Sequence, residues 1–482
     1  MEMKKLFVAM TAVSAMALTA CGSDDDNDSD GGNKVSANTF RATTSDMVAG
    51  DACATVGSFS GLDIKNADGS YTPLCDLSGT ISQDATLTTD FAYRMTGYTY
   101  VGTGNAELDA YADASEVTLT VNAGVQFRSS SSGTLIVTRG SNINMNGTAA
   151  APIVMSSTDV DFDGQGQWGG LVVQGFAKNN QCANEYAANE VCNTADEANS
   201  GFHGGENDAD NSGSITYVIV AEGGYETAPD SEINGITLHS VGYGTTIENV
   251  MVYNNADDGI EFFGGAANVK NLILVDNGDE SLDWDDGWRG NVQFSLIRQG
   301  LVNGGDNGIE ADNKGLSNTA QPVSNPTIAN VTFQTGAEGS SYLMRAKLGT
   351  AGTLVNVAAD NYAKAFRVAD SETDVTLTNV LVEFSGTEAS DILRLENGAT
   401  AANIDGWEST STTATVELGN AFEVMGSQST LTTPATLNSA NGSTGFFDQA
   451  GAGYIGAVAP TVTDKANAWW SWADAVVPAA FK

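Results

Sequence analysis

Short apolar runs alternate with polar turn residues along most of the chain. In the second half the repeated unit is an Asn followed by a branched apolar residue, at Asn249-Val250, Asn271-Leu272, Asn330-Val331, Asn356-Val357, Asn379-Val380 and Asn403-Ile404. Most intervals are about 22 to 26 residues, which lies within the range of solenoid repeats. The longer gap after Asn271 holds a further unit near Val292, in which Phe294 replaces the Asn.

This periodicity predicts an all-β solenoid in which each coil buries its apolar face only against neighbouring coils. Helical repeats are disfavoured because no long segment has a 3.6-residue period and the chain contains 54 Gly. The stretches 119–127, 133–157 and 167–175 fit the same coil. We expect the Asn amides to stack along one turn and to hydrogen-bond from coil to coil, which is a structural role.

With these stretches the chain resembles the pectate-lyase-like superfamily of right-handed parallel β-helices, and more closely a group of acidic bacterial lipoproteins with that fold. The resemblance covers nearly all of residues 70–400. It implies a single right-handed parallel β-helix of about 22–26 residues per coil with capped ends. It implies no one activity, since the superfamily includes lyases, hydrolases, adhesins and inert scaffolds.

The N-terminus has the pattern of an export signal. Lys4 and Lys5 precede an apolar stretch, Leu6–Leu18, that is too short to span a membrane. The following Leu18-Thr19-Ala20-Cys21 resembles the bacterial lipobox, which implies cleavage before Cys21 and attachment of diacylglycerol to its thiol. Ordinary secretion is the alternative. Gly22 after the Cys implies the outer membrane in similar lipoproteins, with the leaflet undetermined.

The predicted organisation is a signal peptide over 1–20, an acidic flexible tether over 21–45 and a β-helix domain over 46–482. The tether is too poor in apolar groups to offset the entropy of ordering it. Aromatic residues near the C-terminus are expected to cap the open apolar end of the coil, or alternatively to stack on carbohydrate; they are Trp469, Trp470, Trp472 and Phe481.

Four cysteines remain if Cys21 carries lipid, namely Cys53, Cys75, Cys182 and Cys192. An even number in an oxidising compartment favours disulfides, and three pairings are possible. Closeness in sequence favours Cys53 with Cys75 and Cys182 with Cys192. Two free structural thiols or a metal site are the alternatives.

The charge balance restricts the partners. The chain has 20 Lys and Arg against 60 Asp and Glu, a net charge of −40. Such a chain repels nucleic acid and anionic membrane surfaces and attracts cations. Calcium, cationic groups on a partner, or solubility alone would account for it.

Acids recur in register with the coil in the segments 254–265, 276–290 and 304–313. Aligned on the apolar residue before the last acid, they place Glu261, Asp283 and Glu310 at one level. Asp257, Asp279 and Asp306 fall at another. Adjacent parallel strands lie about 4.8 Å apart, so these carboxylates should be neighbours in space. Like charges that close raise one another's pKa unless a cation joins them.

Calcium suits such a column, because it accepts six to eight oxygen ligands with loose geometry. The predicted ligand pool is Asp257, Asp258, Glu261, Asp279, Glu280, Asp283, Asp285, Asp286, Asp306, Glu310 and Asp312, with Arg289 neutralising part of it. The alternative is a hydrated acidic face that needs no specific ion. A weaker second calcium loop would start at Asp208.

An enzymatic alternative uses Arg345 and Lys347, in YLMRAKLG, one coil beyond the acids. They resemble the Arg-x-Lys pair with which superfamily pectinases hold uronates, and would supply the base of a calcium-dependent polysaccharide lyase. Arg345 could equally join Arg367 and Arg394 in a basic column. The hydrolase pattern Gly-His-Gly is missing, and His203 and His239 are expected to be surface or turn residues.

These patterns favour a non-catalytic, calcium-stabilised β-helix, lipid-anchored at the bacterial outer membrane, that binds a glycan, an ion or an outer-membrane partner protein. A lyase would have to draw its anionic substrate towards a strongly acidic surface. The alternatives are that calcium-dependent polysaccharide lyase and an adhesin or inert scaffold whose acids serve solubility.

Overall fold

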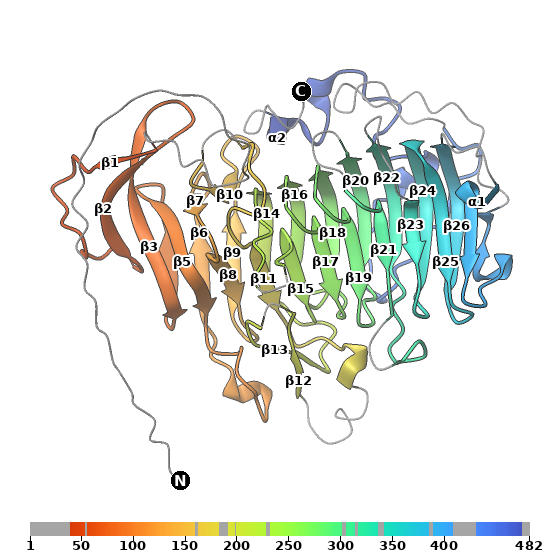
Figure 1. Cartoon of the computed structure of the whole chain (residues 1–482), viewed down its shortest axis with the longest axis horizontal. Coiled ribbons are helices and arrows are strands. Elements are labelled where there is room, and N and C mark those ends of the chain that lie inside the picture. The colour runs from red at the N-terminus through yellow and green to blue at the C-terminus, as the bar shows by residue number, and fades with distance from the viewer. Residues whose placement is uncertain are drawn as a thin grey trace, which may run out of the picture. The chain divides into compact units, whose positions relative to one another are not determined.

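A computed structural model describes residues 39–53, 55–159, 162–182, 191–197, 199–227, 232–300, 305–313, 317–335, 342–384, 389–407 and 430–474. Within these residues the chain forms one long parallel β-sheet wound into coils (Figure 1). The predicted all-β fold and single parallel β-helix are therefore confirmed. The predicted signal peptide, Cys21 and Phe481 lie outside the described residues.

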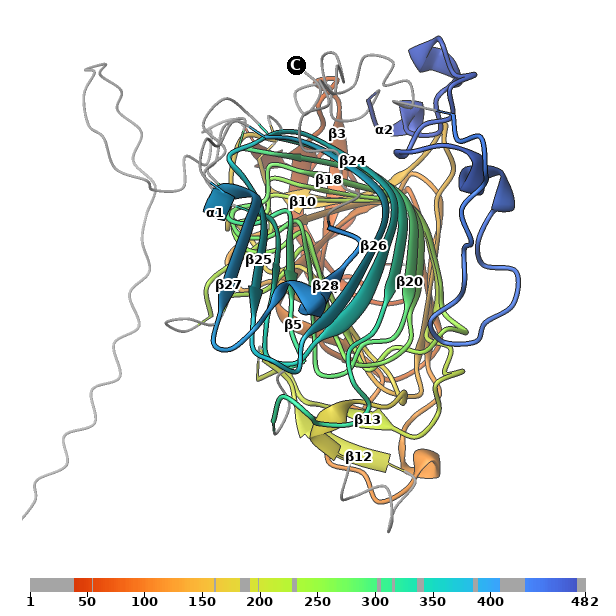
Figure 2. The same ribbon diagram turned by 90° about the vertical axis from the view of Figure 1, so that its right-hand side faces the viewer.

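Each coil of the central region combines a short strand with a longer, bent strand (Figure 2). The short strands stack into what we call the site sheet: β8 (Thr134–Val137), β11 (Leu171–Gln174), β15 (Ile236–His239), β17 (Ile260–Phe263), β19 (Leu282–Asp285), β21 (Ile309–Ala311), β23 (Tyr342–Ala346), β25 (Lys364–Ala369) and β27 (Leu393–Glu396). The long strands form the bent sheet: β14 (Gly213–Ala221), β16 (Thr246–Tyr253), β18 (Asn268–Val275), β20 (Asn291–Gln299), β22 (Thr327–Thr335), β24 (Ala351–Tyr362) and β26 (Asp374–Phe384).

The remaining strands belong to the N-terminal coils and to segments that leave the regular coil between two of its strands. We call these segments excursions. The remaining strands are β1 (Phe40–Ala42), β2 (Ser58–Lys65), β3 (Tyr71–Ile81), β4 (Ala85–Leu87), β5 (Ala92–Val101), β6 (Thr118–Val121), β7 (Gln126–Ser129), β9 (Asn142–Asn146), β10 (Ile153–Ser157), β12 (Val191–Ala195), β13 (Phe202–Gly205) and β28 (Ile404–Asp405). The helices are all short: α1 (Ala389–Ile392), α2 (Ser471–Asp474) and 3-10 turns that include η1 (Tyr111–Asp113), η2 (Asn180–Cys182), η3 (Ala401–Asn403), η5 (Gln449–Gly453) and η6 (Lys465–Asn467). No helix in the described residues is long and apolar enough to cross a bilayer.

Side chains alternate between the inside and the outside of the coil. In β15, Ile236 and Leu238 join the continuous interior core, whereas Thr237 and His239 point away from it. Aromatic side chains fill the interior beside the acidic rungs, where the rings of Phe262 and Trp288 stack with centroids 3.8 Å apart. The outward positions of the site sheet are therefore held on a rigid, fully packed support.

The repeated Asn occupies the bend of each long strand and adopts a left-handed backbone conformation. The φ angles are +54° at Asn249, +58° at Asn271, +54° at Asn330, +58° at Asn356 and +53° at Asn379. Asn tolerates this region better than most residues because its short polar side chain can hydrogen-bond locally. Phe294 takes the same position with φ of +61°.

Amide hydrogen bonds link part of this Asn column, as predicted. Asn271 Nδ2 donates to Asn249 Oδ1 at 3.2 Å, and Asn379 Nδ2 donates to Asn356 Oδ1 at 2.9 Å. Asn403 does not belong to the column, which corrects the prediction. Ile404 pairs with Val375, so Asn403 precedes the strand and instead donates to the Thr373 carbonyl at 2.7 Å.

Replacing Asn356 by Ala is expected to lower the free energy of unfolding by about 2 to 4 kcal/mol. The side chain is fully buried and also donates from Nδ2 to the Gly451 carbonyl at 3.0 Å, so both the turn and its hydrogen bonds are lost. Asn397→Ala is the matched control, because Asn397 is exposed but has φ of +51°. Equal effects in denaturant unfolding would show that only the backbone conformation matters.

The ordered fold begins earlier than predicted. β1 lies within the stretch expected to be tether, yet it pairs antiparallel with β2, and Arg41 forms an ion pair with Asp63 at 3.0 Å. Phe40 packs against a small buried cluster that contains Ile64 and Leu74. These contacts offset the entropy of ordering residues that composition alone assigns to a flexible segment.

The C-terminal tryptophans cover the side of the coil rather than its open end, which corrects the predicted cap. Trp470 and Trp472 are buried against outward residues of the bent sheet, including Ile219 and Met251 (Figure 2, blue segment). The ring of Trp472 also meets that of Tyr217 edge-on, with centroids 5.4 Å apart. Because both indoles are buried, they are not available to stack on a sugar.

Candidate functional site: an acidic cleft on the site sheet

The outward side chains of the site sheet form a column whose charge changes from negative to positive along the coil. Register places Glu261 beside Asp283, and Asp283 beside Glu310, as the alignment of the rungs predicted. The next outward residue is Arg345. Arg367 and Arg394 then follow in register, so the predicted basic column directly continues the acidic one.

Carboxylates from these strands and from the turns before them line a cleft of about 600 Å³, which we call the acidic cleft. Of the predicted ligand pool, Asp257, Asp258, Glu261, Asp279, Glu280, Asp283, Asp285, Glu310 and Asp312 line it. Glu197 and Glu232 line it too, and sequence reasoning missed both. They come from excursions outside the repeated rungs, where no periodic signal marks them.

Asp306 and Asp286 lie outside this lining. A carboxylate oxygen of Asp306 is within 4.8 Å of ligand atoms of Asp279 and Glu280, so it stands at the edge of the cleft. Asp286 faces a second pocket, where its Oδ2 accepts a hydrogen bond from Gln181 Nε2 at 2.5 Å.

Arg289, which was predicted to neutralise part of the pool, has a carboxylate partner outside that pool. Its guanidinium forms an ion pair with Asp208 at 2.9 Å. This pair also accounts for Asp208, the first residue of the weaker calcium loop.

Three overlapping groups of carboxylates bring ligand atoms within 4.8 Å of one another in the acidic cleft. They are Asp257 with Asp258 and Asp279, Asp258 with Glu261 and Asp283, and Asp279 with Glu280 and Asp306. Adjacent rungs supply the members of each group, because equal positions of neighbouring coils lie side by side. The predicted acids therefore form sites that could hold metal ions. A fourth group, Asp159 with Asp163 and Glu222, lies elsewhere on the described coil.

Burial and mutual repulsion disfavour the charged forms of these acids. Burial, reinforced by Glu197 and Asp279, raises the pKa of Asp257 to about 7. Burial and the neighbouring Asp279 raise the pKa of Glu280 to about 8. The pKa values of Asp258, Glu261 and Asp283 are raised well above the ordinary range, again chiefly by burial. A bound cation would remove this penalty.

Amide donors orient part of the cleft. Asn234 Nδ2 donates to Glu261 Oε2 at 2.6 Å, and Asn307 Nδ2 donates to Glu280 Oε1 at 2.6 Å. The backbone N–H of Glu280 donates to Asp258 Oδ1 at 2.8 Å. The Oδ1 atom of Asp283, by contrast, is buried and accepts no hydrogen bond in the described part of the chain. A buried carboxylate oxygen without a hydrogen bond is a position where a ligand is expected.

The comparison with protein families settles which group this coil belongs to. A family model described as a pectate-lyase-like β-helix domain matches residues 79–430. The chain belongs to the pectate-lyase-like β-helix domain family. No curated protein and no solved structure matches the chain significantly.

The matched region of this pectate-lyase-like domain contains every rung of the acidic cleft and the first three arginines beyond it. Arg345 Nη1 lies 3.2 Å from Glu310 Oε2, while the Lys347 ammonium contacts Glu310 and lies 3.3 Å from Asp312 Oδ2. Arg367 and Arg394 both pair with Glu396, at 2.8 and 2.6 Å. The cations proposed for lyase chemistry are thus held by carboxylates.

The two histidines of this pectate-lyase-like domain are buried, so the expectation of surface or turn positions was wrong. His203 lies in β13 and His239 in β15; each is 1% exposed, and their ring centroids are 4.7 Å apart. The contact between the two rings joins β13, in an excursion, to β15 of the site sheet, and the two residues are more than one coil apart in the sequence. Local sequence therefore gave no sign of the contact.

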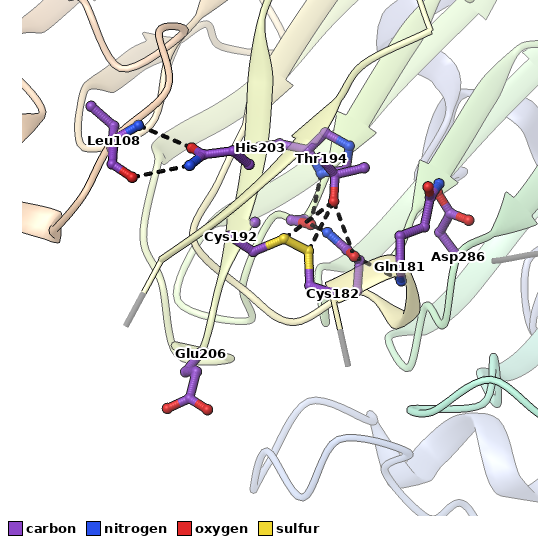
Figure 3. Close-up of a disulfide and its surroundings, with 12 residues drawn as sticks. Leu108, Gln181, Cys182, Cys192, Thr194, His203, Glu206 and Asp286 are labelled. Atoms are coloured by element: carbon purple, nitrogen blue, oxygen red, sulfur yellow. Dashed lines mark hydrogen bonds between the residues drawn. A yellow bond between two sulfur atoms is a disulfide. The ribbon is translucent and has the colours of Figure 1, made fainter. Parts of the chain in front are cut away.

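Both favoured disulfides are present, between Cys53 and Cys75 and between Cys182 and Cys192. The second closes part of the excursion between β11 and β14, which also carries Glu197. Its sulfurs are buried beside Thr194, whose Oγ1 lies 2.9 Å from Cys182 Sγ (Figure 3). The pectate-lyase-like coil is therefore extended at this edge by a covalently closed excursion that supplies one wall of the cleft.

Proposed function

We propose that the chain is a lipid-anchored cell-envelope protein whose β-helix holds calcium in the acidic cleft and binds a glycan, an ion or a partner protein without cleaving it. The observation that carries the proposal is the set of three overlapping carboxylate groups on consecutive rungs. In each group the ligand atoms lie within 4.8 Å of one another and at least one carboxylate is buried. The lipid anchor rests on the segment ending at Cys21, and the outer-membrane location on Gly22.

The donor set favours calcium over other common cations. The cleft presents carboxylate oxygens from several rungs, and calcium accepts six to eight such ligands in flexible geometry. Magnesium demands a tighter octahedron and keeps more of its water. Among the described residues lining the cleft, Lys347 is the one cation, and it is occupied by Glu310 and Asp312.

Binding without cleavage is favoured by the state of Arg345 and Lys347. A lyase base must reach a substrate proton, but both side chains form ion pairs with cleft carboxylates. A calcium ion that keeps open coordination positions could instead accept hydroxyl or carboxylate oxygens from an external ligand. The metal would also offset the repulsion between the acidic surface and an anionic partner.

Calcium is expected to raise the midpoint of thermal unfolding of the purified full-length chain above its value in chelator. A ligand that binds only the native state stabilises it by about 2.7 kcal/mol at a hundredfold excess over its Kd. Asp283→Asn should abolish most of this shift, because it removes charge from the centre of the cleft. Glu372→Gln, at an exposed position, is the matched control and should leave the shift unchanged.

Equal midpoints with and without calcium in the wild-type chain would contradict the calcium site and favour an acidic scaffold. Incubation with uronate polymers separates binding from cleavage. The proposal expects polymer to be retained, or ignored, with no rise in the ultraviolet absorbance of unsaturated products. A rise that disappears in Arg345→Ala or Lys347→Ala would replace binding by lyase activity.

A further inference from the structure

A second pocket of about 190 Å³ adjoins the acidic cleft but differs from it in chemistry. Glu197 and Asp285 line both. The second pocket adds two imidazoles and further carboxylates, from His203, His239, Asp196 and Asp286. We call it the histidine pocket. In this cavity nitrogen ligands and carboxylates lie together.

His239 is the least satisfied group in this pocket. Its side chain is 1% exposed, and neither ring nitrogen has a hydrogen-bond partner among the described residues. Leaving buried polar atoms unpaired costs about 1 to 3 kcal/mol each, so such an atom calls for an explanation. The ring is packed between His203, at 4.7 Å, and Phe263, at 4.6 Å between centroids, which limits its escape to another partner.

The state of the imidazole suits ligation. Burial lowers the pKa of His239 to about 4, although Asp196 partly opposes this, so the ring is neutral at physiological pH. Neutral imidazole is the form that binds metal ions. An unpaired lone pair on a neutral, immobile ring is therefore available inside a pocket lined by carboxylates.

His203 has the kind of support that metal-binding histidines have. Its Nδ1 lies 2.8 Å from Ser240 Oγ, and that oxygen also accepts a hydrogen bond from Asn179 Nδ2 at 3.0 Å. When Ser240 accepts a second hydrogen bond from Nδ1–H, the lone pair of His203 is on Nε2. A partner on the second nitrogen fixes the tautomer and the orientation of the ring.

The carboxylate wall is also held in place. Asp196 Oδ2 accepts from Gln174 Nε2 at 2.7 Å, and Asp196 Oδ1 accepts from the backbone N–H of Ser200 at 2.6 Å. Gln181, which is next to Cys182 of the Cys182–Cys192 disulfide, donates a hydrogen bond to Asp286 (Figure 3). The disulfide limits how far this wall can open.

We propose that the histidine pocket binds a divalent transition-metal ion of the zinc class, with His239 as a nitrogen ligand, His203 as a second and carboxylates completing the set. Imidazole nitrogen favours zinc, nickel or copper, whereas the all-oxygen cleft beside it favours calcium. In the described residues, the groups of three or more potential ligand atoms within 4.8 Å of one another consist of carboxylates alone. Asp196 and Asp286 are held by hydrogen bonds from glutamine side chains. Zinc binding therefore requires another pocket carboxylate, Glu197 or Asp285, to turn towards the imidazoles. The zinc proposal does not rest on calcium binding, although Glu197 and Asp285 line both cavities.

Isothermal titration of the full-length chain with zinc, after treatment with chelator and in excess calcium, tests the assignment. We expect one zinc site whose affinity falls by at least about a hundredfold in His239→Phe and about tenfold in Ser240→Ala, which removes the hydrogen-bond partner of His203 but no proposed ligand. Asp283→Asn, in the acidic cleft, is the matched control and should retain zinc binding. No zinc binding by the wild type, or equal binding by His239→Phe, overturns the proposal.

A second measurement needs no variant, so it remains informative even when His239→Phe does not fold. The chain contains 2 histidines, so its imidazole nitrogens can be followed by NMR without crowding. Zinc ligation should shift a ring nitrogen of His239 while calcium leaves it in place. Imidazole signals that stay unchanged on adding zinc would show that the two rings serve packing only and would overturn the site, whatever calcium does.

Discussion

In the presence of chelator, the free energy of unfolding is expected to fall as the pH rises from about 4 to about 8. The folded-state pKa of Glu280 is raised from 4.5 to about 8, and that of Asp257 from 3.8 to about 7. Between the unfolded and folded values the native protein holds protons that the unfolded chain has released. Stability then decreases with pH, by about 1.4 kcal/mol per pH unit for each such proton.

The sign follows from the direction of the shifts. Below the unfolded pKa values both states are protonated and the penalty is absent; above the folded values both are ionised and the penalty is complete. Urea unfolding at a series of pH values in chelator measures the slope directly. Glu280→Gln, which cannot ionise, should reduce the slope, while the exposed Glu372→Gln should not.

Calcium should flatten or reverse this dependence, because the ion takes the place of the protons and binds the ionised carboxylates more tightly as the pH rises. A flat profile in chelator would mean that the carboxylates ionise without mutual penalty and that the cleft is fully hydrated. A steep profile that calcium leaves unchanged would show that the buried acids do not bind calcium. The pH series thus tests both the raised pKa values of the cleft carboxylates and the proposed binding of calcium to them.

Arg139→Met is expected to lower the free energy needed to open the β12–β13 excursion by about 3 to 5 kcal/mol. The Arg139 side chain is fully buried and burial lowers its pKa to about 10. Its guanidinium donates to the carbonyls of Gly104 at 2.9 Å, Cys192 at 2.6 Å and Ala106 at 2.6 Å. Met fills similar volume but leaves these acceptors buried without donors.

Hydrogen exchange of the amides in β12 and β13 measures this local opening. Protection should be lost there, while the strands β16, β18 and β20 stay protected, since each rung contacts only its neighbours. Arg394→Met is the matched control, because Arg394 is largely exposed and its ion pair with Glu396 should contribute little. Unchanged protection in Arg139→Met would show that the disulfide alone holds the excursion. The histidine pocket depends on this anchor, because the excursion carries His203 and Asp196.

Where the chain repeats, its order along the sequence was enough to predict neighbours in space. Glu261, Asp283 and Glu310 occupy equal positions of successive rungs, and parallel stacking necessarily brings equal positions together. The same reasoning placed the Asn column and the arginines beyond the acids. The prediction was wrong for Asn403, because the chain has extra residues before β28 and an Asn–Ile pair alone does not determine the strand register.

Where the chain leaves the repeat, only the tertiary structure decided the contacts. Glu197 and Glu232 enter the acidic cleft from excursions, Arg289 pairs with Asp208, and His203 contacts His239 from another element. Trp470 and Trp472 likewise pack on the side of the coil, because outward apolar residues of several rungs together form an apolar surface there. The sequence of a single rung does not indicate that surface. The physical reason is common to all of them. Periodic positions are brought together by the coil itself, whereas excursions dock by shape, charge and burial against surfaces that exist only once the coil has formed.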